Sequence, residues 1–195
     1  MMDGKKLLAG LLVCSIALAA TGAVKVRRWG VPFFATVAPG QGAIYQITGK
    51  NSGSVTYTGR VWCVINDVTS GYETEASPSD VQLYKVDGTE KKCSNQGRLC
   101  YFPSESGTTL NPGDEIKGKI KVVIGAGCST GKTFRLKCAM DYRTASGAWV
   151  VVSGSGTTED ISVASPYGDT TIKLVQLLFF LGGGAALLAG LALVI

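Results

Sequence analysis

Apolar and polar residues alternate with a period of two through much of the middle of this chain, and no other feature constrains its fold so strongly. The alternation is clearest in residues 55–65, 115–122 and 134–141. A period of two sends alternate side chains to opposite faces of a strand, whereas an amphipathic helix repeats about every 3.6 residues. These three segments are therefore expected to be half-buried strands.

Turn signals divide the rest of the middle into further short strands. Gly, Pro and Asn residues separate the segments 31–37, 42–49, 81–86, 98–103, 147–153 and 158–164. About nine strands at this spacing, with no helical stretch between them, are typical of an antiparallel sandwich. We predict one all-β domain over residues 29–166.

Both ends of the chain are apolar, at residues 7–24 and 174–195. The second run carries no charge, and at about 1.5 Å per residue a helix of its length crosses a hydrocarbon layer of ~30 Å. We expect residues 167–195 to form a transmembrane helix. Residues 1–28 have two interpretations: a retained membrane helix, which the length of the run favours, or a secretory signal cleaved after Ala17-Leu18-Ala19.

Small residues recur at every fourth position in both runs. Such stripes let two helix backbones approach closely, so we expect helix pairing within one chain or between chains, although small residues are common in membrane helices generally. The stripes are Ser15, Ala19 and Ala23 in the first run and Gly182, Ala186 and Gly190 in the second.

The formal charge of +5 is concentrated at the borders of the apolar runs, where cations meet lipid headgroups. Six cations and one acid account for the whole excess: Lys5, Lys6, Lys25, Arg27, Arg28 and Lys173 against Asp3. The middle is then neutral, which argues against nucleic acid as a partner. The expected partners are the lipid bilayer and further copies of the chain or other surface proteins, with no small-molecule substrate.

Two turn motifs carry a resemblance to a known family. Val37-Ala38-Pro39-Gly40 and Leu110-Asn111-Pro112-Gly113 each precede a strand, and the first leads through Tyr45-Gln46-Ile47-Thr48 to Asn51-Ser52-Gly53. This pattern resembles the immunoglobulin-like β-sandwich domains of bacterial and archaeal surface proteins, including the cell-adhesion-related kind, over residues 36–164. The resemblance implies a binding or structural module and carries over no catalytic residue.

Five of the six cysteines lie in the middle of the chain, which favours a compartment outside the reducing cytosol. Cys93 and Cys100 enclose a short loop suited to a hairpin disulfide. Cys63 and Cys138 both point to the inferred core from strands far apart in sequence, so a bridge between two sheets is expected. Cys128 is left over and could compete for either pair.

The residue types present exclude several kinds of chemistry. The chain has no histidine, so it cannot hold a Ser-His-Asp triad, a Cys-His pair or a histidine-ligated metal. The segment 126–133 resembles a phosphate-binding loop, but alternating residues follow it where such a loop needs a helix, so we expect an ordinary hairpin loop. We predict no enzyme activity, no cofactor and no catalytic or metal site.

Five cations are candidates for a basic patch. Lys117, Lys119 and Lys121 share the outward face of one strand, and Arg135 and Lys137 share that of the next strand in the sequence. Such a patch could dock to anionic lipid, polysaccharide or a partner protein. The alternative is a solvated sheet face whose lysines discourage edge pairing.

These observations favour a non-enzymatic, membrane-anchored surface protein. Its extracytoplasmic β-sandwich would serve structural assembly or adhesion, on a cell envelope or on a membrane-containing virion. The alternatives are an accessory subunit of a larger membrane complex or a pilin-like filament subunit.

Overall fold

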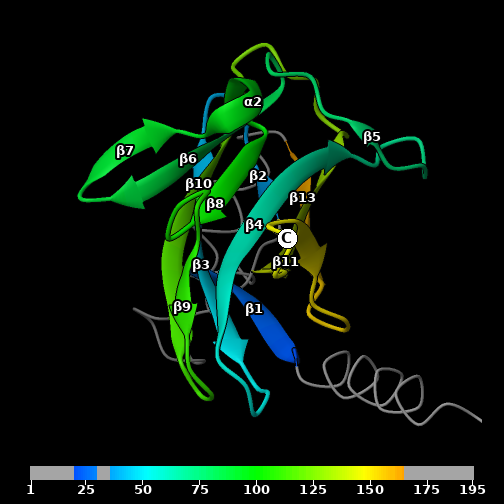
Figure 1. Ribbon diagram of the computed structural model, residues 1–195. Helices are drawn as coiled ribbons and strands as arrows, with labels where there is room; N and C mark the ends of the chain where they lie inside the picture. The colour runs from blue at the N-terminus through cyan, green and yellow to red at the C-terminus, as the bar shows by residue number, and fades with distance from the viewer. Residues whose placement is uncertain (1–19, 30–35, 165–195) are drawn as a thin grey trace, which may run out of the picture.

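Two β-sheets pack face to face and form the body of the molecule (Figure 1). They are seen in a computed structural model that describes residues 20–29 and 36–164. Sheet A has five strands, in the order β1 (Gly22–Trp29), β3 (Gly42–Asn51), β10 (Glu115–Ile124), β6 (Val81–Asp87) and β7 (Thr89–Lys92). All its neighbouring strands are antiparallel.

Sheet B has eight strands and includes the longest ones. Its main path is β2 (Thr36–Val37), β13 (Thr157–Val163), β11 (Thr133–Arg143), β4 (Tyr57–Asp67) and β5 (Thr74–Glu75). Three short strands complete it: β12 (Trp149–Val151) pairs with β11, and β8 (Leu99–Phe102) and β9 (Thr108–Leu110) pair with β4. Within the part of the chain that the structure describes, β2 and β13 are the only strands that pair in parallel. The helix α2 (Ser94–Gly97) precedes β8.

The alternation in the sequence generates the core between the sheets. Apart from Val55, which is 39% exposed before β4 begins, the inward apolar positions of the three clearest segments are buried: Tyr57, Val61, Cys63 and Ile65 of β4; Ile116, Ile120 and Val122 of β10; Phe134, Leu136, Cys138 and Met140 of β11. One cluster of buried residues runs from Val24 to Val163. The expected all-β sandwich is confirmed, and the described residues share one continuous core between the two sheets, as expected for a single domain.

The described residues contain thirteen strands where about nine were expected. The additional ones are β1, β5, β7 and β9. The strand β1 also corrects the expected helix of residues 1–28, because residues 22–28 pair with β3 along their whole length. Val24 and Val26 face inward and Lys25 and Arg27 outward, so the end of the apolar run already alternates as a strand.

The rest of both apolar runs lies outside the described residues, and with it most of the expected helix-packing stripes. Ser15, Ala19, Gly182, Ala186 and Gly190 are among these residues, whereas Ala23 is on β1, opposite Lys50. Within residues 20–29 and 36–164, no helix has the length and apolar character that a membrane crossing requires.

The described chain enters and leaves the sandwich at opposite ends (Figure 1). At one end Gly22, the first residue of β1, pairs with Asn51. At the other end Val163, the last residue of β13, pairs with Val37, and its carbonyl accepts a hydrogen bond from the Gly131 amide at 2.8 Å. The full length of the strands therefore separates the two connections to the terminal runs.

Asn51 gives the Asn-Ser-Gly motif a structural role. Its side chain is fully buried and donates hydrogen bonds to the carbonyls of Val55, at 2.9 Å, and Leu110, at 3.1 Å. Its Oδ1 accepts from the Gly53 amide at 3.0 Å, and its carbonyl accepts from the Gly113 amide at 2.9 Å. Asn51 thus ties the loop after β3 to the Asn-Pro-Gly turn before β10.

Both expected disulfides are present, Cys63–Cys138 and Cys93–Cys100, and Cys128 is buried and free. The first does not join the two sheets as expected. Cys63 and Cys138 are directly opposite each other on the adjacent strands β4 and β11 of sheet B, with their Cα atoms 4.1 Å apart. Cys100 of β8 is opposite Cys63 on its other side, so three cysteines lie abreast across sheet B.

Candidate interaction surface

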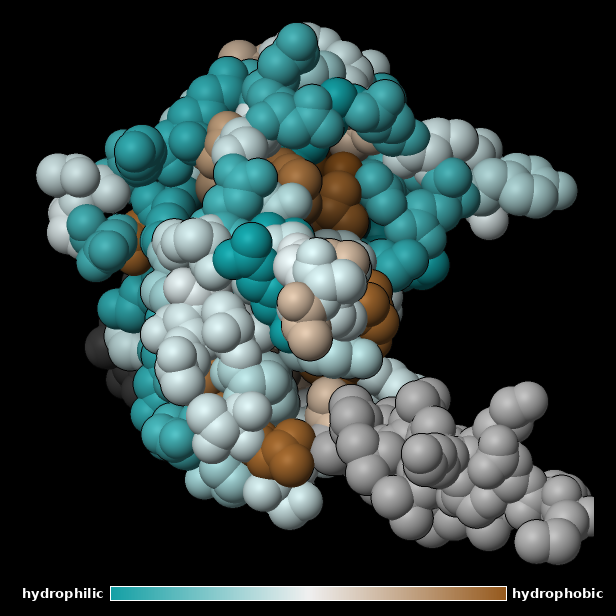
Figure 2. Space-filling model, in the orientation of Figure 1, coloured by the Kyte–Doolittle hydropathy of each residue, from teal (hydrophilic) through white to brown (hydrophobic). Residues whose placement is uncertain are grey.

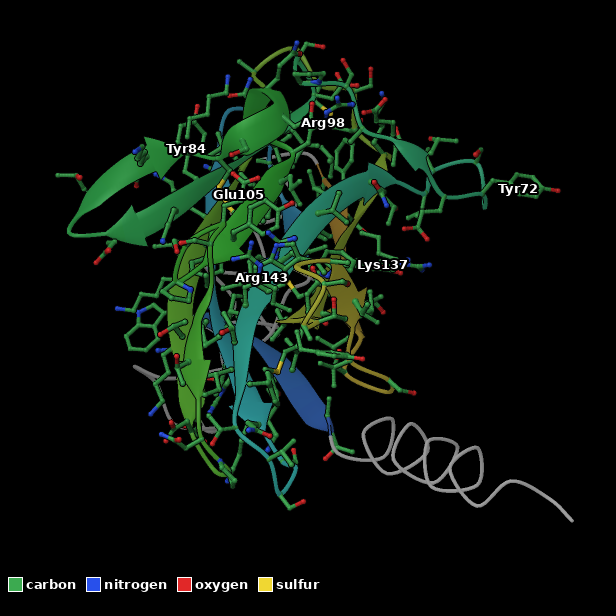
Figure 3. All side chains as sticks on the ribbon, viewed as in Figure 1. Tyr72, Tyr84, Arg98, Glu105, Lys137 and Arg143 are labelled. Carbon is green, nitrogen blue, oxygen red and sulfur yellow. A yellow bond between two sulfur atoms is a disulfide. The ribbon has the colours of Figure 1, made fainter. Side chains whose placement is uncertain are left out.

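The five expected basic-patch residues do not form one surface. Lys117, Lys119 and Lys121 are on β10 in sheet A, whereas Arg135 and Lys137 are on β11 in sheet B. The expectation fails because residues 125–132 cross from one sheet to the other and do not form a hairpin between neighbouring strands. Figure 3 shows the result: Lys137 points away from the molecule on the side opposite Tyr84 of β6.

The cations on the sheet B side already have carboxylate partners. Arg135 donates two hydrogen bonds to Asp160, at 2.7 and 2.8 Å, and these hold the pKa of the Asp160 carboxyl below its usual range. The Lys137 Nζ lies 3.6 Å from a carboxylate oxygen of Glu73. The outer face of sheet B is therefore largely balanced in charge near β11.

The strand register gathers a different set of cations on the outer face of sheet A. Across β3, Lys25 of β1 is in line with Lys117 of β10, and Arg27 is in line with Lys119. Neighbouring cations on one strand are about 7 Å apart, and the two rows are about 10 Å apart, because the strands themselves are ~4.8 Å apart. We call this set the basic face: Lys25, Arg27, Lys50, Lys117, Lys119 and Lys121.

Few carboxylates neutralise the basic face. Lys117 lies 3.2 Å from Glu115, and Lys121 lies 2.7 Å from Glu90. The other four cations have no carboxylate within ion-pair distance among the residues that the structure describes. In Figure 2, hydrophilic residues line the left margin of the molecule, on the side where β3 and β10 lie in Figure 1.

An exposed tryptophan borders the basic face. Trp29 ends β1, in line with Ile44 and Lys121, and 55% of its surface is exposed. The Lys119 Nζ lies 4.8 Å from the centre of its ring, a cation–π distance. A cationic surface edged by an amphipathic ring is typical of proteins that contact lipid headgroups.

A groove of about 680 Å³ lies beside the basic face. It forms because β6 pairs with β10 only from Ile120 onward, so the β6–β7 hairpin leaves residues 115–119 of β10 without a partner on that side. Phe102 packs on Gly118, where any Cβ would overlap its ring. Lys85, whose Nζ donates to the Pro103 carbonyl, adds a further cation to the wall of the groove.

The outer face of sheet B carries a cluster that the sequence did not reveal. Arg60 of β4 is stacked between the rings of Tyr101 and Trp149, at 4.3 and 4.0 Å from their centres. Its Nε and Nη2 donate to Asp141 at 3.3 and 3.2 Å, and Asp141 also accepts from the Trp62 indole at 2.8 Å.

The remaining donor of the Arg60 guanidinium, Nη1, donates to the Glu105 carbonyl at 2.7 Å. Figure 3 shows Glu105 and Arg143 on this side of the molecule. Because Arg60 and Asp141 are almost fully buried and each is already well bonded, the cluster is a structural element and leaves little bonding capacity for a ligand. In the sequence, this cluster was indicated only by two charged residues, Arg60 and Asp141, at outward positions of two alternating segments.

The loop of residues 125–132 has no phosphate-site geometry. Lys132 contacts Asp80 at 2.6 Å and Asp67 at 3.7 Å, so its charge is already compensated. Burial raises the pKa of the neighbouring Cys128 thiol, which makes it a poor nucleophile at neutral pH. Among residues 20–29 and 36–164, no three His, Cys, Asp or Glu side chains are close enough to hold a metal ion.

Comparisons with known proteins support the fold and do not define a family. No model of a known protein family matches the sequence, and no curated protein sequence matches it. Among solved structures, AvmM, described as catalysing macrocyclization in alchivemycin A biosynthesis, superposes with a TM-score of 0.50. It is 12% identical, and the match covers 73% of this chain and 89% of that chain. Such a likeness shows a shared fold and nothing about activity.

Two weaker likenesses were also found. A CARDB domain from Pyrococcus furiosus has a TM-score of 0.42 at 15% identity, covering 75% of this chain and 90% of that chain. A cohesin module from a Clostridium perfringens glycoside hydrolase has a TM-score of 0.44 at 7% identity, covering 75% and 98%. At these scores neither carries an argument about function.

Proposed function

We propose that this protein is a non-enzymatic, membrane-anchored surface module that works in adhesion by docking through the basic face. The observation that carries the proposal is the basic face itself. It presents six cations on neighbouring strands, and only two of them have carboxylate partners among the described residues. An excess of positive charge spread over an exposed sheet face favours association with an anionic surface.

Two further features support this function. The sandwich contains two disulfides, which persist in oxidising compartments such as the cell surface, a periplasm or a virion exterior. The uncharged run of residues 174–195 is long enough to serve as the anchor. The module would then be extracytoplasmic, on a cell envelope or a virion membrane.

The anchoring is tested by expressing the full chain in a bacterium and extracting its membranes with alkaline carbonate. We expect the protein to stay in the membrane, its domain to be cleaved by external protease in spheroplasts, and both disulfides to be formed. A second variant that lacks residues 174–195 should be released. A full-length protein that is cytosolic and reduced would contradict the proposed function.

One observation favours an accessory subunit as a second candidate. The groove beside β10 leaves a strand edge open at residues 115–119, and an extended segment of another protein could pair there. Purification in mild detergent distinguishes the two functions. Stoichiometric co-purification of a different subunit supports the accessory role, and a homogeneous single-chain or homo-oligomeric particle supports the adhesion role.

A further inference from the structure

We infer that the sandwich lies on its side on the anionic surface of its own membrane, with the basic face against the headgroups. This inference rests on the proposed function, because it requires an anchored chain. It adds that the anionic surface to which the basic face binds is the membrane in which the chain itself is anchored. Three features of the fold lead to it.

The first feature is the two-dimensional arrangement of the cations. The basic face consists of two rows, on β1 and β10, with Lys50 on β3 between them. A linear polyanion would follow one row at a time, since the rows are about 10 Å apart. A bilayer surface presents negative charge in two dimensions and can contact both rows together. Trp29 stands at the edge of the same face, where its ring would enter the headgroup layer.

The second feature is the position of the chain ends. The terminal runs are connected to opposite ends of the sandwich, and the ten residues of β10 extend over about 33 Å. In an upright sandwich, one connection would be near the membrane and the other about one strand length above it. When the strands lie parallel to the membrane, both connections are close to its surface.

The third feature is the length of chain outside the sandwich. Nine residues, 165–173, separate the described domain from the apolar run at Leu174, and nine residues reach at most about 30 Å even if fully extended. At the other end β1 begins at Gly22, within the first apolar run of residues 7–24, so no linker separates the sandwich from the rest of that run. If the N-terminal run is retained, both connections stay near the membrane surface most easily when the sandwich lies on its side. If that run is cleaved, the nine residues still keep the basic face within reach of the membrane, at a high effective concentration.

The inference is tested first with residues 20–164 and vesicles of phosphatidylcholine, with or without phosphatidylglycerol. We expect binding only to the anionic vesicles. The variant Lys25→Gln/Arg27→Gln/Lys119→Gln should bind about 100-fold more weakly, because each cation near an anionic surface contributes about 1 kcal/mol, or roughly fivefold. Raising NaCl from 0.1 to 1 M shortens the screening length from about 10 Å to about 3 Å and should abolish binding.

The matched control removes the same charge from the opposite face. Arg135→Gln/Lys137→Gln/Arg143→Gln changes three outward residues of β11, and this variant should bind the anionic vesicles as the wild type does. If both triple variants lose affinity equally, net charge and not the basic face drives binding, and the inference is overturned. It is also overturned if the wild-type domain ignores anionic vesicles but binds a soluble anionic polysaccharide.

The second test uses the full chain reconstituted in proteoliposomes that contain brominated lipids. We expect the bromine to quench tryptophan fluorescence in the wild type and much less in Trp29→Phe, because Trp29 borders the basic face and Trp62 belongs to the cluster on the other sheet. Equal quenching in both proteins would contradict the side-lying orientation. Carbonate extraction of the same samples distinguishes a wrong orientation from a wrong function. A chain that leaves the membrane contradicts the proposed function, whereas a chain that stays but shows equal quenching contradicts only the side-lying orientation.

Discussion

Removing the two disulfides one at a time should destabilise the domain by clearly different amounts. The Cys63–Cys138 bridge closes a loop with a sequence separation of 75, and the Cys93–Cys100 bridge closes one of 7. In the chain-entropy description, cross-linking removes freedom from the unfolded state in proportion to the logarithm of loop length. The expected stabilisation at 25 °C is about 4.5 kcal/mol for the longer loop and about 2.4 kcal/mol for the shorter one.

The comparison uses Cys63→Ala/Cys138→Ala and Cys93→Ala/Cys100→Ala, both in residues 20–164 with Cys128→Ser to prevent thiol exchange. Urea unfolding followed by fluorescence gives the free energy of unfolding and the m-value. We expect the first pair to cost about 2 kcal/mol more than the second and to raise the m-value more, because a longer unfolded segment becomes free to expand. Equal losses, or a larger loss for the short loop, would refute the loop-entropy argument.

Three further predictions concern buried polar groups. Asn51→Ala should lower the free energy of unfolding by about 2–4 kcal/mol in urea titrations, because the Leu110 carbonyl and the Gly53 amide lose their partner. The control Thr56→Ala removes an exposed hydrogen bond nearby and should change the free energy of unfolding by less than about 1 kcal/mol. Asp141→Ala should cost about 3–5 kcal/mol because it leaves the Arg60 charge buried and unpaired. A loss no larger than that of Asp160→Ala, which breaks a more exposed pair, would contradict this. Burial raises the pKa of the Tyr45 phenol to about 12, while the unfolded chain titrates near 10, so stability should be unaffected below about pH 10 and fall by about 3 kcal/mol toward pH 12. The loss of stability at alkaline pH should be smaller in Tyr45→Phe. Thermal unfolding at a series of pH values, with Cys128→Ser in both proteins, measures this loss. If the loss is the same in both proteins, groups other than Tyr45 cause it.

The sequence predicted the strands that bury one face and missed the ones that do not. The alternation was visible because buried apolar residues alternate with charged ones in β10 and β11, and with Thr58 and Arg60 in the first half of β4. The strand β7 has four exposed residues and β5 has only two, so neither carries an apolar signal. The strand β1 was hidden because Ala23 and Val24 continue the apolar run, and Thr21 and Gly22 are too weakly polar to separate the strand from it.

Which strands share a sheet could not be predicted from the sequence. Successive strands pair with each other about two-thirds of the time, so β10 and β11 were expected to be neighbours. Their separation moved Arg135 and Lys137 to the other face and left Lys25 and Arg27, assigned to a membrane border, to complete the basic face. The sheet of a strand was also mistaken for Cys63 and Cys138. The disulfide between them was predicted correctly, but the two strands that carry them were wrongly placed in different sheets. Both errors concern which strands are neighbours in a sheet, and this depends on contacts between segments far apart in the chain.

The row of three cysteines across sheet B makes the order of oxidation matter during folding. Cys63 has Cys138 on one side and Cys100 on the other, so geometry alone offers it two partners. Closing the loop between Cys93 and Cys100, with a sequence separation of 7, is favoured over closing the loop of 37 between Cys63 and Cys100 by about 1.5 kcal/mol, or roughly twelvefold, so we expect Cys93 to capture Cys100 first. Once Cys100 is occupied, Cys63 has a single free neighbour at its level of the sheet. The short disulfide therefore protects the long one from mispairing, a kinetic role beyond its smaller contribution to stability.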